Sequence, residues 1–234
     1  MGRHSRQIPL FGDEGQTRIA ASKAAIIGCG GLGCNVATQL ALAGVGTLLL
    51  IDYDRPSESD FNRQFPHILN PEMMKCDSLA HWVSRISGTG CETVPEGFGE
   101  DNFESVLGGC DVAVDCLDNN DARLALNRAC HASGIPLVHG AADGFLIQTT
   151  TCVGRPCLEC FLKPGGAYGG PSVGTAVSAL AGMQATEALR LLSGSGAANV
   201  GFFVSIDLSS GSYRRIPLVG SDDCPICNTH PGLF

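Results

Sequence analysis

A strand, a glycine-rich turn and a helix follow one another near the start of this chain. The apolar run 24–27 ends at Gly28, and apolar residues return at helical spacing over 36–43. Gly28, Gly30 and Gly33 fit G-x-G-x-x-G, in which missing side chains let backbone N–H groups approach a phosphate at the positive end of the helix. Glycines also occur where a strand turns sharply into a helix with nothing bound, so the motif alone leaves both interpretations open.

Composition limits the class of protein. A chain of 234 residues with 44% hydrophobic content can bury the core of one α/β domain. No apolar run approaches the roughly 20 residues of a membrane span, and the first residues lack the pattern of a signal peptide. The net charge of -8 argues against a nucleic-acid surface. We therefore expect a cytoplasmic protein, with no membrane or nucleic-acid partner, that binds small molecules or other proteins.

The order of the expected elements indicates the fold. Strand and helix alternate up to residue 140, which predicts a Rossmann-like, mostly parallel sheet. Strand-like runs at 145–153, 202–208 and 212–218 then follow, with a long helix expected over 175–192. We therefore expect the parallel sheet to be continued by antiparallel strands.

Polar residues gather after the second expected strand. Asp52 ends the apolar run 47–51, and it lies 24 residues beyond Gly28, near the position where a dinucleotide fold places an acid on a ribose hydroxyl. It would alternatively cap the next turn. The stretch that follows has no clean period and offers groups that can reach an anion. These are Asp54, Ser59, Asp60, Asn62 and Arg63.

Arg63, Lys75 and Asp118 form a second pattern with the glycine turn. A nicotinamide dehydrogenase needs neither this pair of cations nor an Asp after its fourth strand. A nucleoside triphosphate does, because cations offset charge on its phosphates and a carboxylate can hold Mg²⁺. The alternative is that Lys75 is a solvated helix charge and Asp118 only caps a helix.

Two C-x-x-C pairs stand apart from the other cysteines. Cys157 and Cys160 form the first, Cys224 and Cys227 the second, and 63 residues separate them. Two such pairs predict a structural zinc site with four thiolates. Two disulfides or a redox pair are the alternatives, and His230 is a substitute ligand or a solvated tail residue. The other eight cysteines are expected to be small buried hydrophobes.

The chain resembles the MoeB/ThiF/HesA group, the prokaryotic relatives of ubiquitin-activating enzymes, over almost its whole length. The resemblance rests on motifs that occur in the same order. They are Arg6-Gln7, Gly15-Gln16, the Gly28–Gly33 turn, Asp52-Tyr53-Asp54, Asn62-Arg63-Gln64, Lys75, Asp115-Cys116-Leu117-Asp118-Asn119, Arg123, Gly140-Ala141-Ala142, both cysteine pairs and Gln184-Ala185-Thr186-Glu187-Ala188.

This resemblance implies an ATP-dependent adenylyltransferase acting on the C-terminal glycine of a ubiquitin-like sulfur-carrier protein, or on a peptide treated in the same way. It implies that Gly31 and Asp52 hold the nucleotide, that Arg63 and Lys75 hold its phosphates, and that Asp118 organises Mg²⁺ with Asn119 nearby. Arg6 would reach the γ-phosphate in the partner subunit of a homodimer. The cofactors implied are ATP, Mg²⁺ and Zn²⁺.

The same resemblance gives the expected organisation, a single adenylation domain over residues 1–234. Its parts are an N-terminal arm (1–22), a nucleotide-binding half (23–140) and a half for the zinc and the carrier (141–234). With no rhodanese-like segment in the chain, we expect any sulfur donor to be a separate protein.

Two departures from the family pattern affect these expectations. Asp60 stands where the family usually has Asn, so its side chain is expected to point away from the phosphates or to help bind a metal ion. The loop 165–173 has no cysteine, whereas relatives that link covalently to their carrier have one there, so we expect an external nucleophile to take the acyl group. A non-catalytic scaffold that binds a ubiquitin-like protein and an NAD-dependent oxidoreductase remain as alternatives.

Overall fold

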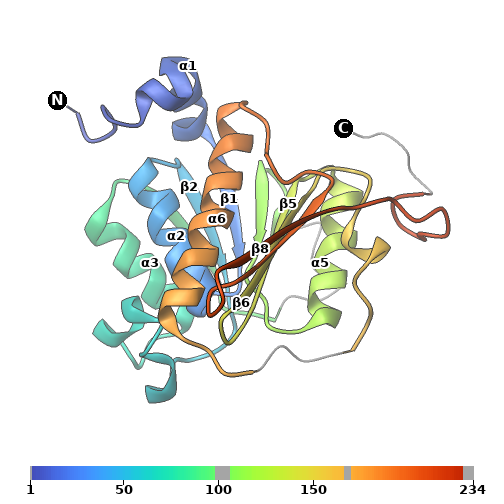
Figure 1. Cartoon of the computed structure of the whole chain (residues 1–234). Helices are drawn as coiled ribbons and strands as arrows, with labels where there is room; N and C mark the ends of the chain where they lie inside the picture. Colours follow the sequence, from blue (N-terminus) through green and yellow to red (C-terminus); the bar gives the residue numbers. More distant parts are fainter. Residues whose placement is uncertain (1, 98–105, 166–169, 229–234) are drawn as a thin grey trace.

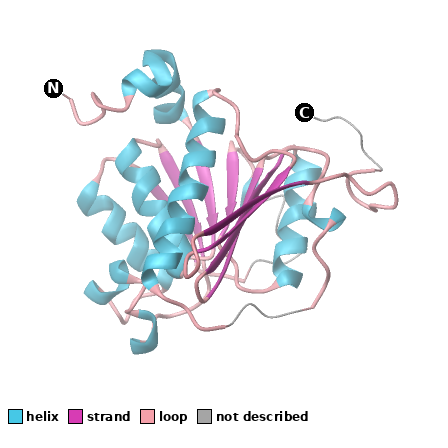
Figure 2. Cartoon of the chain, viewed as in Figure 1, coloured by secondary structure: helices cyan, strands magenta, loops and turns pink. Residues whose placement is uncertain are grey.

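The computed structural model describes residues 2–97, 106–165 and 170–228, and its centre is one eight-stranded sheet in the order β3-β2-β1-β4-β5-β6-β7-β8 (Figures 1 and 2). The first five strands are parallel, and β6, β7 and β8 continue the sheet antiparallel. The expected mostly parallel sheet with antiparallel strands is confirmed. The strands are β1 (Lys23–Ile27), β2 (Thr47–Ile51), β3 (Gly90–Val94), β4 (Val112–Asp115), β5 (Leu137–Asp143), β6 (Leu146–Cys152), β7 (Phe202–Asp207) and β8 (Ser212–Pro217).

Helices cover both faces of the central parallel strands, which explains why β1 and β2 are almost continuously apolar. In β1, Ala24 and Ile26 pack into the cluster beneath α2, α3 and α6, whereas Ala25 and Ile27 pack into the cluster with α5. This alternation is the two-residue period of a strand. The helices are α1 (Ile8–Ala21), α2 (Gly31–Ala43), α3 (Lys75–Ile86), α5 (Asn120–Ser133) and α6 (Gly174–Ser193), with short 3-10 helices η1 (Glu58–Asp60), η2 (Phe65–Leu69) and η3 (Leu158–Cys160).

The strand order places a crevice beside the glycine turn. From β1 the chain moves outward through β2 to β3, then crosses to the other side of β1 as β4 and β5. Ligands of open α/β sheets bind at such a point of reversal, beyond the carboxyl ends of the strands. The glycine turn that follows β1 lies at this point of the sheet.

The cysteine-free loop 165–173 falls partly outside the described residues. Within the described part of the chain, no helix combines the length and the apolar character needed to cross a bilayer.

Candidate functional site

A cavity of about 710 Å³ lies beyond the carboxyl ends of β1, β2 and β4. Most of the residues that the sequence marked for a nucleotide line it, namely Gly28, Gly30, Gly31, Asp52, Asp54, Asp60, Arg63, Lys75, Asp118 and Asn119. Gly33, Ser59 and Asn62 lie outside its lining, and Arg6 is exposed and does not line it either. The lining also includes Tyr53, Arg55, Gln64, Leu117 and Arg123, which the sequence did not mark as nucleotide contacts.

The glycine turn requires glycine at two positions for different reasons. Gly28 has a φ of +92°, and a Cβ there would lie 2.7 Å from the carbonyl oxygen of Cys116. A Cβ at Gly33 would lie 1.9 Å from the carbonyl oxygen of Gly28, so Gly33 permits α2 to pack against the turn. The third glycine of the motif therefore has a packing role, which fits its place outside the cavity.

Asp52 ties the glycine turn to the end of β2. Its Oδ2 accepts a hydrogen bond from the Cys29 N–H at 2.7 Å, and its Oδ1 accepts one from the Asp54 N–H at 2.8 Å. Burial raises the pKa of Asp52, whereas these two donors and the charge of Lys75 act in the opposite direction. Asp52 thus shapes the turn as well as lining the cavity.

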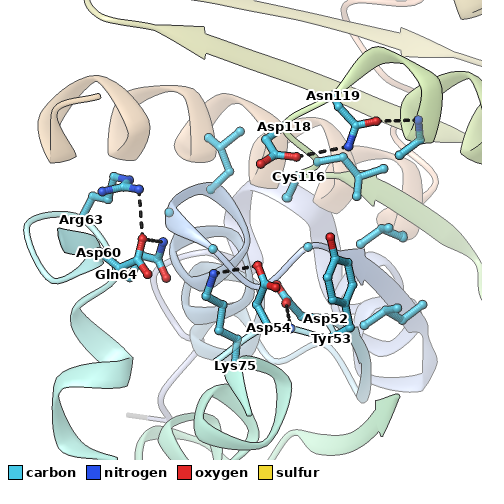
Figure 3. Close-up of a pocket in the computed structure, with 18 of the residues that line it drawn as sticks. Asp52, Tyr53, Asp54, Asp60, Arg63, Gln64, Lys75, Cys116, Asp118 and Asn119 are labelled. Carbon is cyan, nitrogen blue, oxygen red and sulfur yellow. Dashed lines mark hydrogen bonds and ion pairs between the residues drawn. The ribbon is translucent and has the colours of Figure 1, made fainter. Parts of the chain in front are cut away.

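Arg63 is held on one side of the cavity by Asp60 (Figure 3). Asp60 Oδ1 lies 3.1 Å from Arg63 Nη2 and accepts a hydrogen bond from Gln64 at 2.9 Å, while its Oδ2 accepts one from the Ser57 N–H. Partial burial raises the pKa of Asp60, but the bonds from Ser57 and the charges of Lys75 and Arg63 outweigh it, and the pKa is lowered. The expectation that Asp60 points away from the site is wrong, because its carboxylate faces Arg63 and the cavity.

Replacing Asp60 by Asn tests what this extra charge does. Asn keeps an oxygen that can accept from Arg63 and Gln64, but it removes one negative charge beside an anionic nucleotide. We expect D60N to bind ATP–Mg²⁺ about 3–10-fold more tightly at low salt, roughly 1 kcal/mol, with a smaller gain at high salt. Isothermal titration calorimetry measures this, with the exposed neighbour variant E58Q as the control. Weaker binding by D60N would mean that the carboxylate itself is needed.

Lys75 lies between the two ends of the cavity and is paired with Asp54. Its Nζ is 3.3 Å from Asp54 Oδ2, and the residue is only 8% exposed although it begins α3. The backbone N–H of Lys75 also donates to the Asp54 carbonyl at 2.9 Å. Lys75 is therefore a buried cation held at the cavity wall, which excludes the solvated helix charge considered from the sequence.

Asp118 lies at the opposite end of the cavity from Arg63, as Figure 3 shows. The helix cap of α5 is supplied by its neighbour, because Asn119 Oδ1 accepts from the Ala122 N–H at 2.9 Å. Asn119 Nδ2 also donates to Asp118 Oδ1 at 3.3 Å. Asp118 is exposed to the cavity, and its carboxylate does not cap the helix.

A buried polar cluster beneath Asp118 has no counterpart among the site residues that the sequence predicted. Asp115 is fully buried, and its Oδ2 lies 2.6 Å from His139 Nδ1 and 3.5 Å from Arg123 Nε. Arg123 Nη2 donates to the Leu117 carbonyl at 2.6 Å, and Gln184 donates to the Asp115 carbonyl at 2.8 Å. These bonds fix the backbone at residues 115–117, and they therefore help to hold Asp118 in position at the cavity. The family motifs contain Asp115, Arg123 and Gln184 but not His139, and only the fold shows that these four residues meet.

The four cysteines of the C-x-x-C pairs converge. Their sulfur atoms all lie within 4.8 Å of one another, with Cys157 Sγ 3.7 Å from Cys224 Sγ and Cys160 Sγ 3.4 Å from Cys227 Sγ. Tetrahedral zinc with Zn–S bonds of about 2.3 Å places its sulfurs about 3.8 Å apart. The cluster therefore fits Zn²⁺, and the cysteines of the described chain form no disulfide. His230 lies outside the described residues.

Comparison with known proteins agrees with this architecture. The ThiF family model matches residues 4–226. The chain is 35% identical to the SAMP-activating enzyme E1 of Haloferax volcanii over 97% of this chain and 88% of the relative, and 33% identical to the molybdopterin-synthase adenylyltransferase of Escherichia coli over 97% and 96%. It is 36% identical to the mouse adenylyltransferase and sulfurtransferase MOCS3 over 98% of this chain, but it spans only 53% of that protein.

A solved structure gives the same fold at much lower identity. The crystal structure of E. coli MccB with ATP matches with a TM-score of 0.85 and 17% identity, covering 97% of this chain and 74% of that one. At this identity the match concerns the fold alone. The family match and the relatives above 30% identity carry the assignment, and the resemblance seen in the sequence is confirmed: the chain belongs to the ThiF family.

Proposed function

We propose that this protein is an ATP-dependent adenylyltransferase that activates the C-terminal carboxylate of a ubiquitin-like sulfur-carrier protein, or of a peptide. A carboxylate oxygen attacks the α-phosphorus of ATP, the bond to pyrophosphate breaks, and acyl-AMP and pyrophosphate result. The observation that carries the proposal is one cavity at a glycine turn with Arg63 and Lys75 on one part of its wall and Asp118 on another. The names of the relatives, a molybdopterin-synthase adenylyltransferase and a SAMP-activating enzyme, support it.

The residues of the cavity have the chemistry that this reaction needs. Arg63 and Lys75 attract the phosphates of ATP and offset the charge that develops on pyrophosphate. Asp118 offers carboxylate oxygens, the ligands that Mg²⁺ prefers, and bound Mg²⁺ would neutralise phosphate charge there. The backbone at Gly31, at the start of α2, receives a phosphate, and Asp52 and Asp54 lie on the side of β2 where the ribose would sit. The chain mainly holds two anions in position for reaction.

A second cavity of about 350 Å³ offers a route for the carrier. The buried side chain of Arg123 lines both cavities, so the two adjoin at this residue. Phe161, Phe203 and Ile216 give the second cavity an apolar wall on the antiparallel part of the sheet. We propose that the carrier docks on this wall, within the half 141–234, and that its C-terminal tail passes toward Asp118.

Placing a charge in this wall should separate carrier binding from nucleotide binding. In the F203E variant, we expect the KM for the carrier to rise at least tenfold while the Kd for ATP–Mg²⁺ stays within twofold, because Phe203 lines only the second cavity. Carrier-dependent pyrophosphate exchange and calorimetry measure the two. The control is Y213E on neighbouring β8, whose side chain is already exposed and does not line either cavity. Equal losses in both affinities would reject this docking wall.

The remaining parts of the proposal concern assembly and the fate of the acyl group. The exposed Arg6 completes the nucleotide site of a partner chain in a homodimer of cytoplasmic, single adenylation domains. The loop 165–173 has no cysteine, and burial raises the pKa of the thiols of Cys29, Cys116 and Cys152. These thiols are poor nucleophiles, so an external nucleophile takes the acyl group. Where sulfur is transferred to the carrier, a separate protein donates it.

ATP–pyrophosphate exchange tests the proposed function directly. The purified chain is incubated with ATP, Mg²⁺, labelled pyrophosphate and small candidate proteins ending in Gly-Gly. Label entering ATP only when a carrier with a free C-terminus is present supports the proposal. Binding of a carrier without any exchange would favour the non-catalytic scaffold, and tight NAD binding without an ATP response would favour the oxidoreductase.

A further inference from the structure

His67 is a buried histidine to which the proposed reaction assigns no role. It lies in η2, is 0% exposed, and uses both ring nitrogens. Its Nε2 lies 2.8 Å from the carbonyl oxygen of Cys29, in the glycine turn, and its Nδ1 lies 3.1 Å from Ser78 Oγ in α3. One imidazole therefore connects the backbone of the glycine turn to a side chain of α3.

The partners determine which nitrogen carries the proton. The Cys29 carbonyl can only accept a hydrogen bond, so Nε2 must donate. Nδ1 then accepts from the Ser78 hydroxyl, which can donate. Burial lowers the pKa of His67, and the charge of Lys75 lowers it further, whereas the bond to Cys29 and the charges of Asp52 and Asp60 raise it. The net shift is downward, which favours the neutral ring with its proton on Nε2.

The bond to Cys29 fixes the orientation of a peptide plane that borders the nucleotide cavity. The Cys29 N–H is held by Asp52 at 2.7 Å, and the Cys29 carbonyl is held by His67. In a trans peptide the C=O and the N–H point in opposite directions, so fixing this carbonyl also fixes the N–H of Gly30. Gly30 lines the cavity, and among the described residues none accepts a hydrogen bond from its N–H.

We infer that His67 is a positioning residue that aims the Gly30 N–H at a phosphate of the nucleotide, by holding the Cys29–Gly30 peptide from behind. The inference rests on the proposed function, because it assigns a phosphate to this turn. His67 does not touch the nucleotide. It acts through the backbone, and the preorganised N–H binds the anion without first having to turn toward it.

Three variants separate this role from a general contribution to folding. H67F keeps a ring of similar size but loses both hydrogen bonds. H67Q places an amide N–H near the position of Nε2 and restores the donor to Cys29. S78A removes the bond on the other side of the ring and leaves the bond to Cys29 intact, so it is the matched control for an unpaired polar atom in the core.

The first measurements are the Kd for ATP–Mg²⁺ by calorimetry and the Tm of each variant. We expect H67F to bind ATP about tenfold more weakly than the wild type, and H67Q to recover most of the lost affinity. S78A should bind ATP within twofold of the wild type, even if its Tm falls as far as that of H67F. The KM for the carrier should not change in any of them. Losses of affinity that follow the Tm across all three variants, or an H67F that binds ATP normally, would overturn the inference.

Nuclear magnetic resonance of the nucleotide-free protein gives a second readout. We expect ¹⁵N correlation spectra to show His67 with its proton on Nε2, and relaxation to show a Gly30 N–H that is rigid in the wild type and S78A but mobile in H67F. A proton on Nδ1, or equal order at Gly30 in all variants, contradicts the inference. If the wild type bound no ATP, the proposed function would fail together with the phosphate role, while the relaxation data would still decide whether His67 orders the turn.

Discussion

Replacing Asp118 by alanine is expected to lower carrier-dependent ATP–pyrophosphate exchange by about 10³-fold, because the reaction loses the carboxylate that would hold Mg²⁺ against the phosphates. Asp118 is exposed to the cavity and its neighbour Asn119 caps α5, so the substitution removes chemistry without removing the cap. The Tm should therefore change by less than about 2 °C. Initial exchange rates at saturating ATP and carrier measure the effect.

Two further variants sharpen this result. D118N keeps the shape of the side chain and an oxygen ligand but loses the charge, so we expect most of its exchange activity to be lost, with partial recovery at high Mg²⁺. D13A removes an exposed carboxylate from α1, away from the cavity lining, and should exchange like the wild type. Unchanged exchange in D118A would remove Asp118 from the mechanism and leave the Mg²⁺ role to another carboxylate.

The fold was largely predictable because its signals are local. Apolar strands, the glycine turn and the helix signals between them are set by residues near one another in the chain. The structure confirms the strands expected at 24–27, 47–51, 145–153, 202–208 and 212–218. The order of the strands in the sheet could not be predicted from the hydrophobic pattern alone. It follows from the handedness of parallel crossovers and, here, from the resemblance to a known family.

The contacts within the site were harder to predict, because they depend on which side chains meet in space. For Asp60 two expectations were open, that it faces away from the phosphates or that it helps to bind a metal ion. The structure shows it at the cavity wall, paired with Arg63 three residues on, and its metal binding stays a prediction. His67 carried no sequence signal at all. A lone histidine in an irregular segment has many roles, and only the packing of η2 behind the glycine turn brings it to the Cys29 carbonyl. Residue types indicated the chemistry, while tertiary contacts set the geometry.

The second large effect expected is loss of the cysteine cluster. In C227S one of four sulfur ligands is replaced, and we expect bound zinc to fall from one ion per chain to nearly none when measured by mass spectrometry. Cys224 and Cys227 lie beyond β8, and Cys157 and Cys160 lie in the segment after β6, so the ion would tie the C-terminal segment to the body of the sheet. Losing about 3 kcal/mol of this stabilisation would lower the Tm by about 6–12 °C.

The location of the cluster decides what else should change. None of its four cysteines lines the nucleotide cavity, and a site whose four positions are all filled by protein has none left for a substrate. We therefore expect C227S to bind ATP–Mg²⁺ within twofold of the wild type at 20 °C, well below its Tm. C91S, which alters a partly exposed cysteine of β3, should keep both its zinc and its Tm. A C227S protein with the Tm of the wild type would show that the cluster does not hold a structural ion. A C227S protein that kept its fold but bound ATP more weakly would show that the cysteine cluster contributes to the nucleotide site.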